Sequence, residues 1–468
     1  MSEKDKTLIF VILAIVAVFG CMVMSCCAAG FYMISQINRD TIKDILDETE
    51  TAPNFGSDNG NSGQLYTNNN SDDEVNDSNG LSNVEVSVMQ ETERVRGLSS
   101  ETELSLVYQT EEELREYLTE QYQEISDEEF ASDLSFYTIL GFTPKEFDLR
   151  QFYIDLYTEQ IAGFFDPEEN QMYLVEDASA YENAQTLAHE YTHFLQYNNP
   201  LFGSKMQSYD DDYCEDHGEA CVVIEALSEG DATLTENLTN VDSIIGKNNI
   251  NSGEYSPSNV FDNAPKFFTE SLLFPYYYGY DFVSYYYLKG GFDAVNDLFI
   301  NLPQSIEQIM HPEKYLKDEP VTVTLEPFRS IIDKEFEIVH EDVMNEADIY
   351  MVLTCGYQED WQLSERQGAI GADGWGGGSF LFAEKDDKPL LFTKVVWDDQ
   401  KEAEDAETVF ALYLDKRFGD PVEKNVWVGE DNSRVYLIRQ EDMLYWMILP
   451  DNFDSDSFVN LIRNGRIL

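Results

Sequence analysis

Residues 183–198 read N-A-Q-T-L-A-H-E-Y-T-H-F-L-Q-Y-N, a run whose apolar residues recur at helical spacing. Pro200 follows the run, so we expect one helix that ends just before it. An α-helix has 3.6 residues per turn, so His189 and His193 project from the same face and can bind one Zn²⁺. Glu190 lies between them, where its carboxylate can reach a water molecule on that metal.

The spacing H-E-x-x-H is improbable by chance in this composition. The chain has 468 residues, of which 5 are His and 90 are Asp or Glu. These frequencies give roughly 0.01 expected matches to the motif. A helix that carries two histidines and this glutamate is typical of enzymes that hydrolyse peptide bonds with a zinc-activated water. The pattern therefore predicts a metal site with peptidase chemistry.

A catalytic zinc ion usually takes a third protein ligand and leaves one position for water. A second helix is expected over residues 219–238, and it carries Glu225 and Glu229 one turn apart on the same face. From the spacing alone, either carboxylate could reach the metal.

The segment A-L-S-E-G-D-A at residues 226–232 resembles the L-x-E-G-x-A segment with which gluzincin metallopeptidases present a glutamate ligand. The resemblance implies a zincin-like fold in which Glu229 is the third zinc ligand, with Glu225 as the alternative. It extends to a hairpin expected over residues 163–175, where thermolysin-like gluzincins place a substrate-binding edge strand.

Within the gluzincins, the chain is most similar to uncharacterised, membrane-anchored prokaryotic members that share the S-x-E-Q-x-x-H-P-x-x-Y segment, here residues 305–315. This resemblance makes His311 a candidate donor to the oxyanion of the reaction, and the alternative is a capping or packing histidine. Those proteins carry a G-W-G-G-D loop, but Gly378 stands here in place of the acid. The chain lacks the G-x-M-E-N motif of the aminopeptidase branch, which favours an endopeptidase.

The composition excludes some partners. Lys and Arg total 29 against 90 Asp and Glu, so the formal net charge is −61 and the pI is near 4.1. Such a chain repels phosphates, so we expect no nucleic-acid partner. Hydrophobic residues make up 43% of the chain, enough for folded cores, and its length favours two folded domains with extensions.

The first 38 residues are expected to form a membrane anchor. No charged residue lies between Lys6 and Arg39, and this span exceeds the roughly 20 residues that cross a bilayer. The alternatives are a cleaved signal peptide or a lipid attached to Cys21 or Cys26. The acidic bulk of the chain favours a single-pass protein of the cell membrane whose catalytic part is extracytoplasmic.

The remaining chain divides by composition into a disordered acidic, Asn- and Ser-rich stalk at 39–90, a metallopeptidase domain at 91–345 and an accessory α+β domain at 346–468. The expected fold class is α+β. The expected strands are 104–109, 163–166, 171–175, 390–396, 434–439 and 444–449, and the expected helices are one from residue 110 and those at 127–140, 143–159, 183–198, 219–238, 267–300 and 401–418.

Three cysteines fall in the folded part of the chain. A bridge between Cys214 and Cys221 would suit an oxidising exterior, provided that Cys214 precedes the helix, because two full helical turns would hold the sulfurs too far apart. The alternative is that these two and Cys355 are all buried free thiols.

Together these patterns predict a membrane-anchored zinc endopeptidase that acts on peptide or protein substrates. His189, His193 and Glu229 are the expected ligands, and Glu190 is the expected general base. One alternative is a non-hydrolytic surface-binding or adhesion protein that retains a zincin fold, and another is a structural protein that binds no metal. The intact motif favours the enzyme, because a retired site has no chemical need for Glu190.

Overall fold

The computed structural model describes residues 81–176, 179–214, 217–245 and 259–463. The anchor expected over residues 1–38, and the stalk as far as residue 80, lie outside the described residues. Within the described ranges, no helix combines the length and the apolar character that crossing a bilayer requires.

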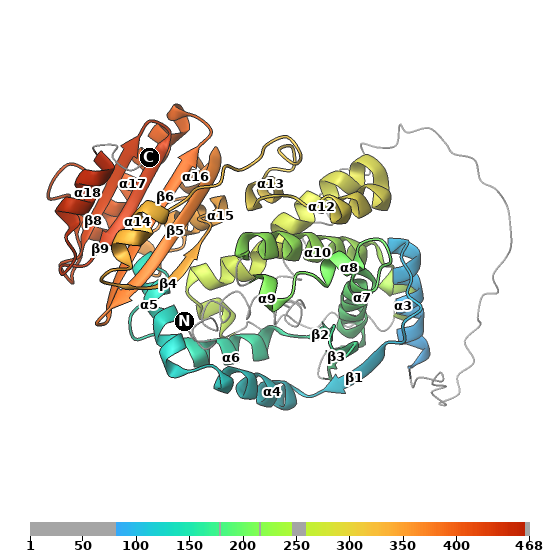
Figure 1. Ribbon diagram of the computed structural model, residues 1–468. Helices are drawn as coiled ribbons and strands as arrows, with labels where there is room; N and C mark the ends of the chain where they lie inside the picture. Colours follow the sequence, from blue (N-terminus) through green and yellow to red (C-terminus); the bar gives the residue numbers. More distant parts are fainter. Residues whose placement is uncertain (1–80, 177–178, 215–216, 246–258, 464–468) are drawn as a thin grey trace.

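Two bodies of secondary structure make up the described chain and confirm an α+β class (Figure 1). The first combines helices with a small mixed sheet in the order β1-β3-β2. The second is built on a six-stranded antiparallel sheet in the order β4-β5-β6-β9-β8-β7. In Figure 1 the first body runs from blue to yellow and the second from orange to red.

The small sheet consists of β1 (Ser105–Gln109), β2 (Gly163–Asp166) and β3 (Gln171–Val175). As the sequence predicts, β2 and β3 form an antiparallel hairpin, whereas β1 pairs with β3 in parallel. The strand order places β2 at one edge of this sheet. The helices of the first body are α3 (Asn83–Arg96), α4 (Glu111–Glu124), α5 (Asp127–Leu140), α6 (Leu149–Gln160), α7 (Ala180–Tyr197), α8 (Gly203–Met206), α9 (Asp211–Cys214), α10 (Gly218–Leu238), α11 (Val241–Ile245), α12 (Lys266–Ile300) and α13 (Ile306–Met310).

Capping residues explain where the helices of the first body begin. Thr110, Ser126 and Ser179 each form a capping box, in which the hydroxyl accepts the backbone N–H three residues on and the glutamate there bonds back. Helix α5 has the predicted bounds, and α7 and α10 begin and end within three residues of theirs. Helix α6 begins six residues after its predicted start, because Asp148 provides its N-cap.

Helix α3 includes residues that composition assigned to the stalk. Ser82 caps its N-terminus and Gly97 ends it in a left-handed conformation. Val88 and Met89 are buried, and α3 lies against α7 (Figure 1). The stalk boundary expected at residue 90 therefore falls inside a packed helix, because these two apolar side chains bury enough surface to order it.

Helices α10 and α12 approach each other at two glycines. A Cβ on Gly230 would overlap the backbone carbonyl of Gly279, and a Cβ on Gly279 would overlap the carbonyl of Ala226. The glycine that follows Glu229 in the sequence motif therefore has a packing role: it lets α12 lie directly against α10. Helix α12 is itself interrupted at Gly290 and Gly291, which have non-helical backbone angles.

The second body begins before the boundary expected at residue 346, because β4 (Glu337–Asp342) pairs with β5 (Trp375–Lys385) in the large sheet. Its other strands are β6 (Lys388–Trp397), β7 (Val426–Val428), β8 (Arg434–Gln440) and β9 (Met443–Leu449), and its helices are α14 (Glu326–Ile332), α15 (Glu346–Thr354), α16 (Glu365–Ala372), α17 (Gln400–Phe418) and α18 (Ser455–Arg463). The strands predicted at β6, β8 and β9 and the helix predicted at α17 are confirmed.

One of the hydrophobic cores contains residues of both bodies. Tyr122 and Tyr153 of the first body belong to the same buried cluster as Trp375 and Trp446 of the large sheet. At their junction, the Arg417 guanidinium donates to three carbonyls in the last turn of α5 and at its end. A cation in this place satisfies helix carbonyls that have no partner within the helix.

The structure shows that Cys214 and Cys221 are bridged, which their spacing alone did not decide. Cys214 ends α9 and Cys221 lies in α10, so the chain turns between them, and the two form a disulfide with Cα atoms 5.7 Å apart. Cys355 is buried and, in the described part of the chain, unbridged.

We expect Gly230→Ala to destabilise the protein by about 1 to 3 kcal/mol, because the added methyl group overpacks the contact between α10 and α12. Asn237→Ala, at an exposed position on the same helix, is the matched control and should change stability little. Chemical denaturation of both variants measures the difference. Equal stability of the two variants would contradict this account of the glycine.

Candidate metal centre

Helix α7 carries both histidines of the motif into the protein interior. The side chain of His189 is 0% exposed and that of His193 is 7% exposed. Their ring centroids lie 4.9 Å apart, as expected for residues one turn apart. Buried imidazoles need polar partners, and helix α10 supplies them.

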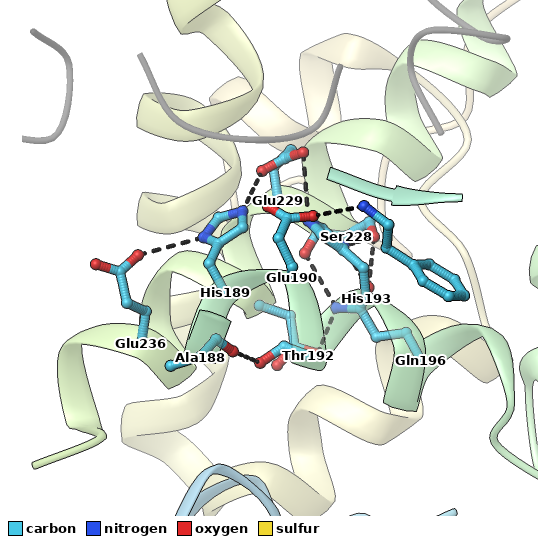
Figure 2. Close-up of polar contacts among 11 residues, drawn as sticks. Ala188, His189, Glu190, Thr192, His193, Gln196, Ser228, Glu229 and Glu236 are labelled. Atoms are coloured by element: carbon cyan, nitrogen blue, oxygen red, sulfur yellow. Dashed lines mark hydrogen bonds and ion pairs between the residues drawn. The ribbon is translucent and has the colours of Figure 1, made fainter. Parts of the chain in front are cut away.

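The carboxylate of Glu229 lies between the two imidazoles (Figure 2). One of its oxygens is 3.0 Å from Nε2 of His189, and the other is 3.5 Å from Nε2 of His193. Two ligands of a tetrahedral zinc ion lie roughly 3.3 Å apart, because each is about 2.0–2.2 Å from the metal. Both carboxylate-to-imidazole distances are therefore close to the separation of two ligands on one metal ion.

Glu190 is fully buried and is oriented by the small sheet. The backbone N–H of Phe165, in edge strand β2, donates to Oε2 of Glu190 at 3.0 Å. His189, Glu190 and His193 each place one potential ligand atom within 4.8 Å of the others. The structure thus brings the glutamate of the motif to the same place as the two imidazoles and attaches it to the hairpin that precedes α7.

The far nitrogen of each imidazole also has a partner. Nδ1 of His189 lies 3.3 Å from a carboxylate oxygen of Glu236, two turns beyond Glu229 on α10. Nδ1 of His193 lies 3.0 Å from Oε1 of Gln196 and 3.2 Å from the hydroxyl of Ser228 (Figure 2). Such contacts orient metal-binding imidazoles and fix which nitrogen carries the proton.

Negative charge dominates the electrostatics of the site. Burial alone would lower the pKa of His189, but its hydrogen bonds to Glu229 and Glu236 outweigh that effect and raise the pKa well above its ordinary value. Burial likewise opposes a rise in the pKa of His193, which the charge of Glu229 nevertheless produces. The carboxylates therefore stabilise positive charge at this position, whether it is carried by protons or by a metal ion.

The pKa values of Glu229 and Glu225 shift in opposite directions. Burial would raise the pKa of Glu229, but the nearby His193 and His189 reverse that effect and lower it. Burial raises the pKa of Glu225 well above its ordinary value, and the charge of Glu229 adds to the rise. A metal ligand has to be ionised, so Glu229 has the more suitable carboxylate.

The donor set fits a zinc ion. Two imidazole nitrogens and one carboxylate oxygen are the ligands of several catalytic zinc sites, and each imidazole here has a second partner that orients it. The residues that would hold the ion are His189, His193 and Glu229. The structure accordingly supports a possible metal-binding group on α7, formed by His189, Glu190 and His193.

His311 lies in a different cluster. It forms the C-cap of α13, and its Nε2 is 2.9 Å from Oε1 of the buried Glu346. Glu346 and Asp373 complete a second group of potential ligands with it. The hydrogen bond to Glu346 raises the pKa of His311. Burial acts in the opposite direction and offsets only part of this rise. The structure thus pairs His311 with a carboxylate, and its predicted role at the oxyanion stays a prediction.

Some neighbours of the site were not among the predicted residues. Glu236 follows Glu229 by seven residues, so helical spacing could have placed both on one face. Gln196 follows His193 by three residues and could have been found in the same way. Tyr276 gave no such signal, because its spacing does not set it apart from the neighbouring Tyr277 and Tyr278, and its ring centroid is 6.2 Å from that of His189.

We expect the chain to bind about one zinc ion, and Glu229→Gln to raise the Kd by at least the 10- to 100-fold that loss of an outer-sphere partner causes. His193→Ala should act in the same direction, because it removes a ligand nitrogen. Glu225→Gln is the matched control and should leave the Kd near the wild-type value. Competition with a coloured chelator measures these constants. Weak binding by Glu225→Gln alone would move the ligand assignment to Glu225.

Comparison with known proteins finds a match only for the second body. A family model described as a domain of unknown function, DUF8575, matches residues 334–457. This segment begins just before β4, ends within α18 and contains the whole six-stranded sheet. No curated protein and no solved structure is detectably similar to the chain. The group formed by His189, Glu190 and His193 lies outside the matched segment, so the family match says nothing about its chemistry.

Proposed function

We propose that this protein is a zinc-dependent endopeptidase of the gluzincin type, with His189, His193 and Glu229 as ligands. The observation that carries the proposal is the position of Glu229, whose two oxygens face Nε2 of both motif histidines in the interior. The sequence resemblance nominated the same glutamate, which supports its inclusion among the proposed ligands.

Glu190 is the proposed general base. A bound zinc would make water nucleophilic at neutral pH and polarise the scissile carbonyl. Glu190 would take the proton of the attacking water and pass it to the leaving amine. Its contact with the backbone N–H of Phe165 holds the carboxylate in one orientation beside the two histidines.

Strand β2 is the proposed place for an extended substrate. It is an edge strand of the small sheet, and Phe165 directs its N–H toward Glu190 rather than toward β3. An extended peptide can bind beside an edge strand through main-chain hydrogen bonds. A peptide in that place would lie next to the proposed base, which supports cleavage within a chain.

The proposed location is the exterior of the cell membrane, with the N-terminal segment as the anchor. Support comes from the uncharged span between Lys6 and Arg39 and from the disulfide between Cys214 and Cys221. Disulfides of this kind persist in oxidising compartments and are rare in the cytosol.

Glu190→Gln should retain zinc and lose hydrolysis by about 10²- to 10⁴-fold, because the amide cannot accept the proton of the attacking water. Hydrolysis of casein by the full-length chain, with and without chelator, measures the effect, and metal analysis checks the zinc content. Glu120→Gln, at an exposed position on α4, is the control and should behave as wild type. A Glu190→Gln variant with full activity would refute the assignment.

His311→Ala should keep zinc and fold but lower kcat by about 10²- to 10³-fold if the imidazole donates to the developing oxyanion. The contact with Glu346 favours the protonated imidazole, in which the nitrogen not paired with Glu346 also carries a hydrogen to donate. Normal kcat in this variant would leave His311 a structural role at the end of α13.

A further inference from the structure

A buried ion pair lies beneath the metal centre. Nε of Arg96, the last residue of α3, lies 2.7 and 2.9 Å from the two carboxylate oxygens of Asp231 on α10. Both side chains are 0% exposed. Burying two charges is unfavourable unless the pair is well placed and further hydrogen bonds compensate. A fully enclosed pair two residues from Glu229 therefore calls for an account of what it does.

Asp231 is connected to α7 through the side chain of Gln196. The side-chain nitrogen of Gln196 donates to Oδ2 of Asp231 at 2.9 Å and to the backbone carbonyl of Ser228 at 3.0 Å. Both of these groups only accept hydrogen bonds. Turning the amide over would place its oxygen against two acceptors, so Asp231 and the Ser228 carbonyl permit one orientation of Gln196.

This orientation directs an acceptor at His193. Oε1 of Gln196 lies 3.0 Å from Nδ1 of His193, and the Ser228 hydroxyl donates to the same Oε1 at 2.6 Å. Because Oε1 has no hydrogen to give, Nδ1 of His193 has to carry the proton of this contact. In the neutral imidazole, Nε2 then holds the lone pair, and Nε2 is the nitrogen that faces Glu229.

We propose that Arg96 and Asp231 act through Gln196 as positioning residues that hold His193 in the tautomer able to bind metal at Nε2. Asp231 fixes the amide of Gln196, and the amide fixes the proton on Nδ1. Arg96 pairs with Asp231 and fixes the position of its carboxylate, which accepts from Gln196. The inference rests on the proposed metal site and adds α3 to its supporting structure.

The test uses zinc affinity and the absorption spectrum of bound Co²⁺ in the full-length chain. Gln196→Met removes the nearer of the two acceptors of Nδ1, leaves the Ser228 hydroxyl, and should raise the zinc Kd by about 10- to 100-fold and shift the Co²⁺ bands. Gln196→Glu should rescue both readouts, because a side-chain oxygen still faces Nδ1 of His193 and can accept its hydrogen bond. If Gln196 only filled space, Gln196→Glu would not bind zinc more tightly than Gln196→Met.

A double variant, Arg96→Met with Asp231→Leu, separates positioning from charge balance. It removes both charges together, so no unpaired buried ion is left behind. We expect it to fold, as judged by circular dichroism, and to bind zinc about 10- to 100-fold more weakly than wild type. If it does not fold, the comparison of Gln196→Met with Gln196→Glu decides the proposal.

Tyr191→Phe is the matched control. It removes a hydrogen bond of 2.8 Å from Tyr191 to Glu93, which also joins α7 to α3 but does not involve Gln196. Its zinc affinity should equal that of wild type. Gln196→Met with wild-type affinity and an unchanged Co²⁺ spectrum would overturn the proposal. A wild-type chain that binds no zinc would instead overturn the proposed metal site itself.

Discussion

The contact of one buried carboxylate with two buried imidazoles is the constraint on which the helical body depends. Glu229 is 1% exposed, and a carboxylate can occupy such a position only where donors or cations compensate for the lost water. Helices α7 and α10 therefore have to lie at the depth and angle that bring Glu229 to His189 and His193. The glycine contact between α10 and α12 lets a third helix cover α10 closely, which completes the enclosure of the site.

Charge balance explains why the surroundings of this contact are so polar. Glu190, Glu229 and Glu236 are all buried within reach of two imidazoles, so the group has more acid than base. The nearby Asp231 differs from these three glutamates, because the Arg96 guanidinium forms an ion pair with it. Protons on the two imidazoles or a bound divalent cation would each offset these acids. A site selected only for stability would more simply contain apolar side chains of similar volume, since those often replace buried ions without loss.

Local signals allowed much of the fold and the centre of the site to be predicted. Hydrophobic periodicity located α5, α7 and α10, and the turn between β2 and β3 located the hairpin. The parallel pairing of β1 with β3 was not predictable in this way, because the two strands are far apart in sequence. Helix α3 was missed since its few apolar residues follow a long polar segment. Glu229 needed the family resemblance, because spacing alone could not separate it from Glu225.

The relation between the two bodies bears on what the matched C-terminal family domain does in this chain. Its sheet begins at β4, close to the start of the family match, rather than at residue 346. Trp375 and Trp446 of this sheet share a core with helices α4 to α6, and Arg417 satisfies the end of α5. Helix α6 leads directly into β2, the strand that holds Glu190. Residues that support the sheet therefore also support the elements that orient the proposed base. The domain is better regarded as part of the scaffold of the proposed metal centre than as a separate appendage.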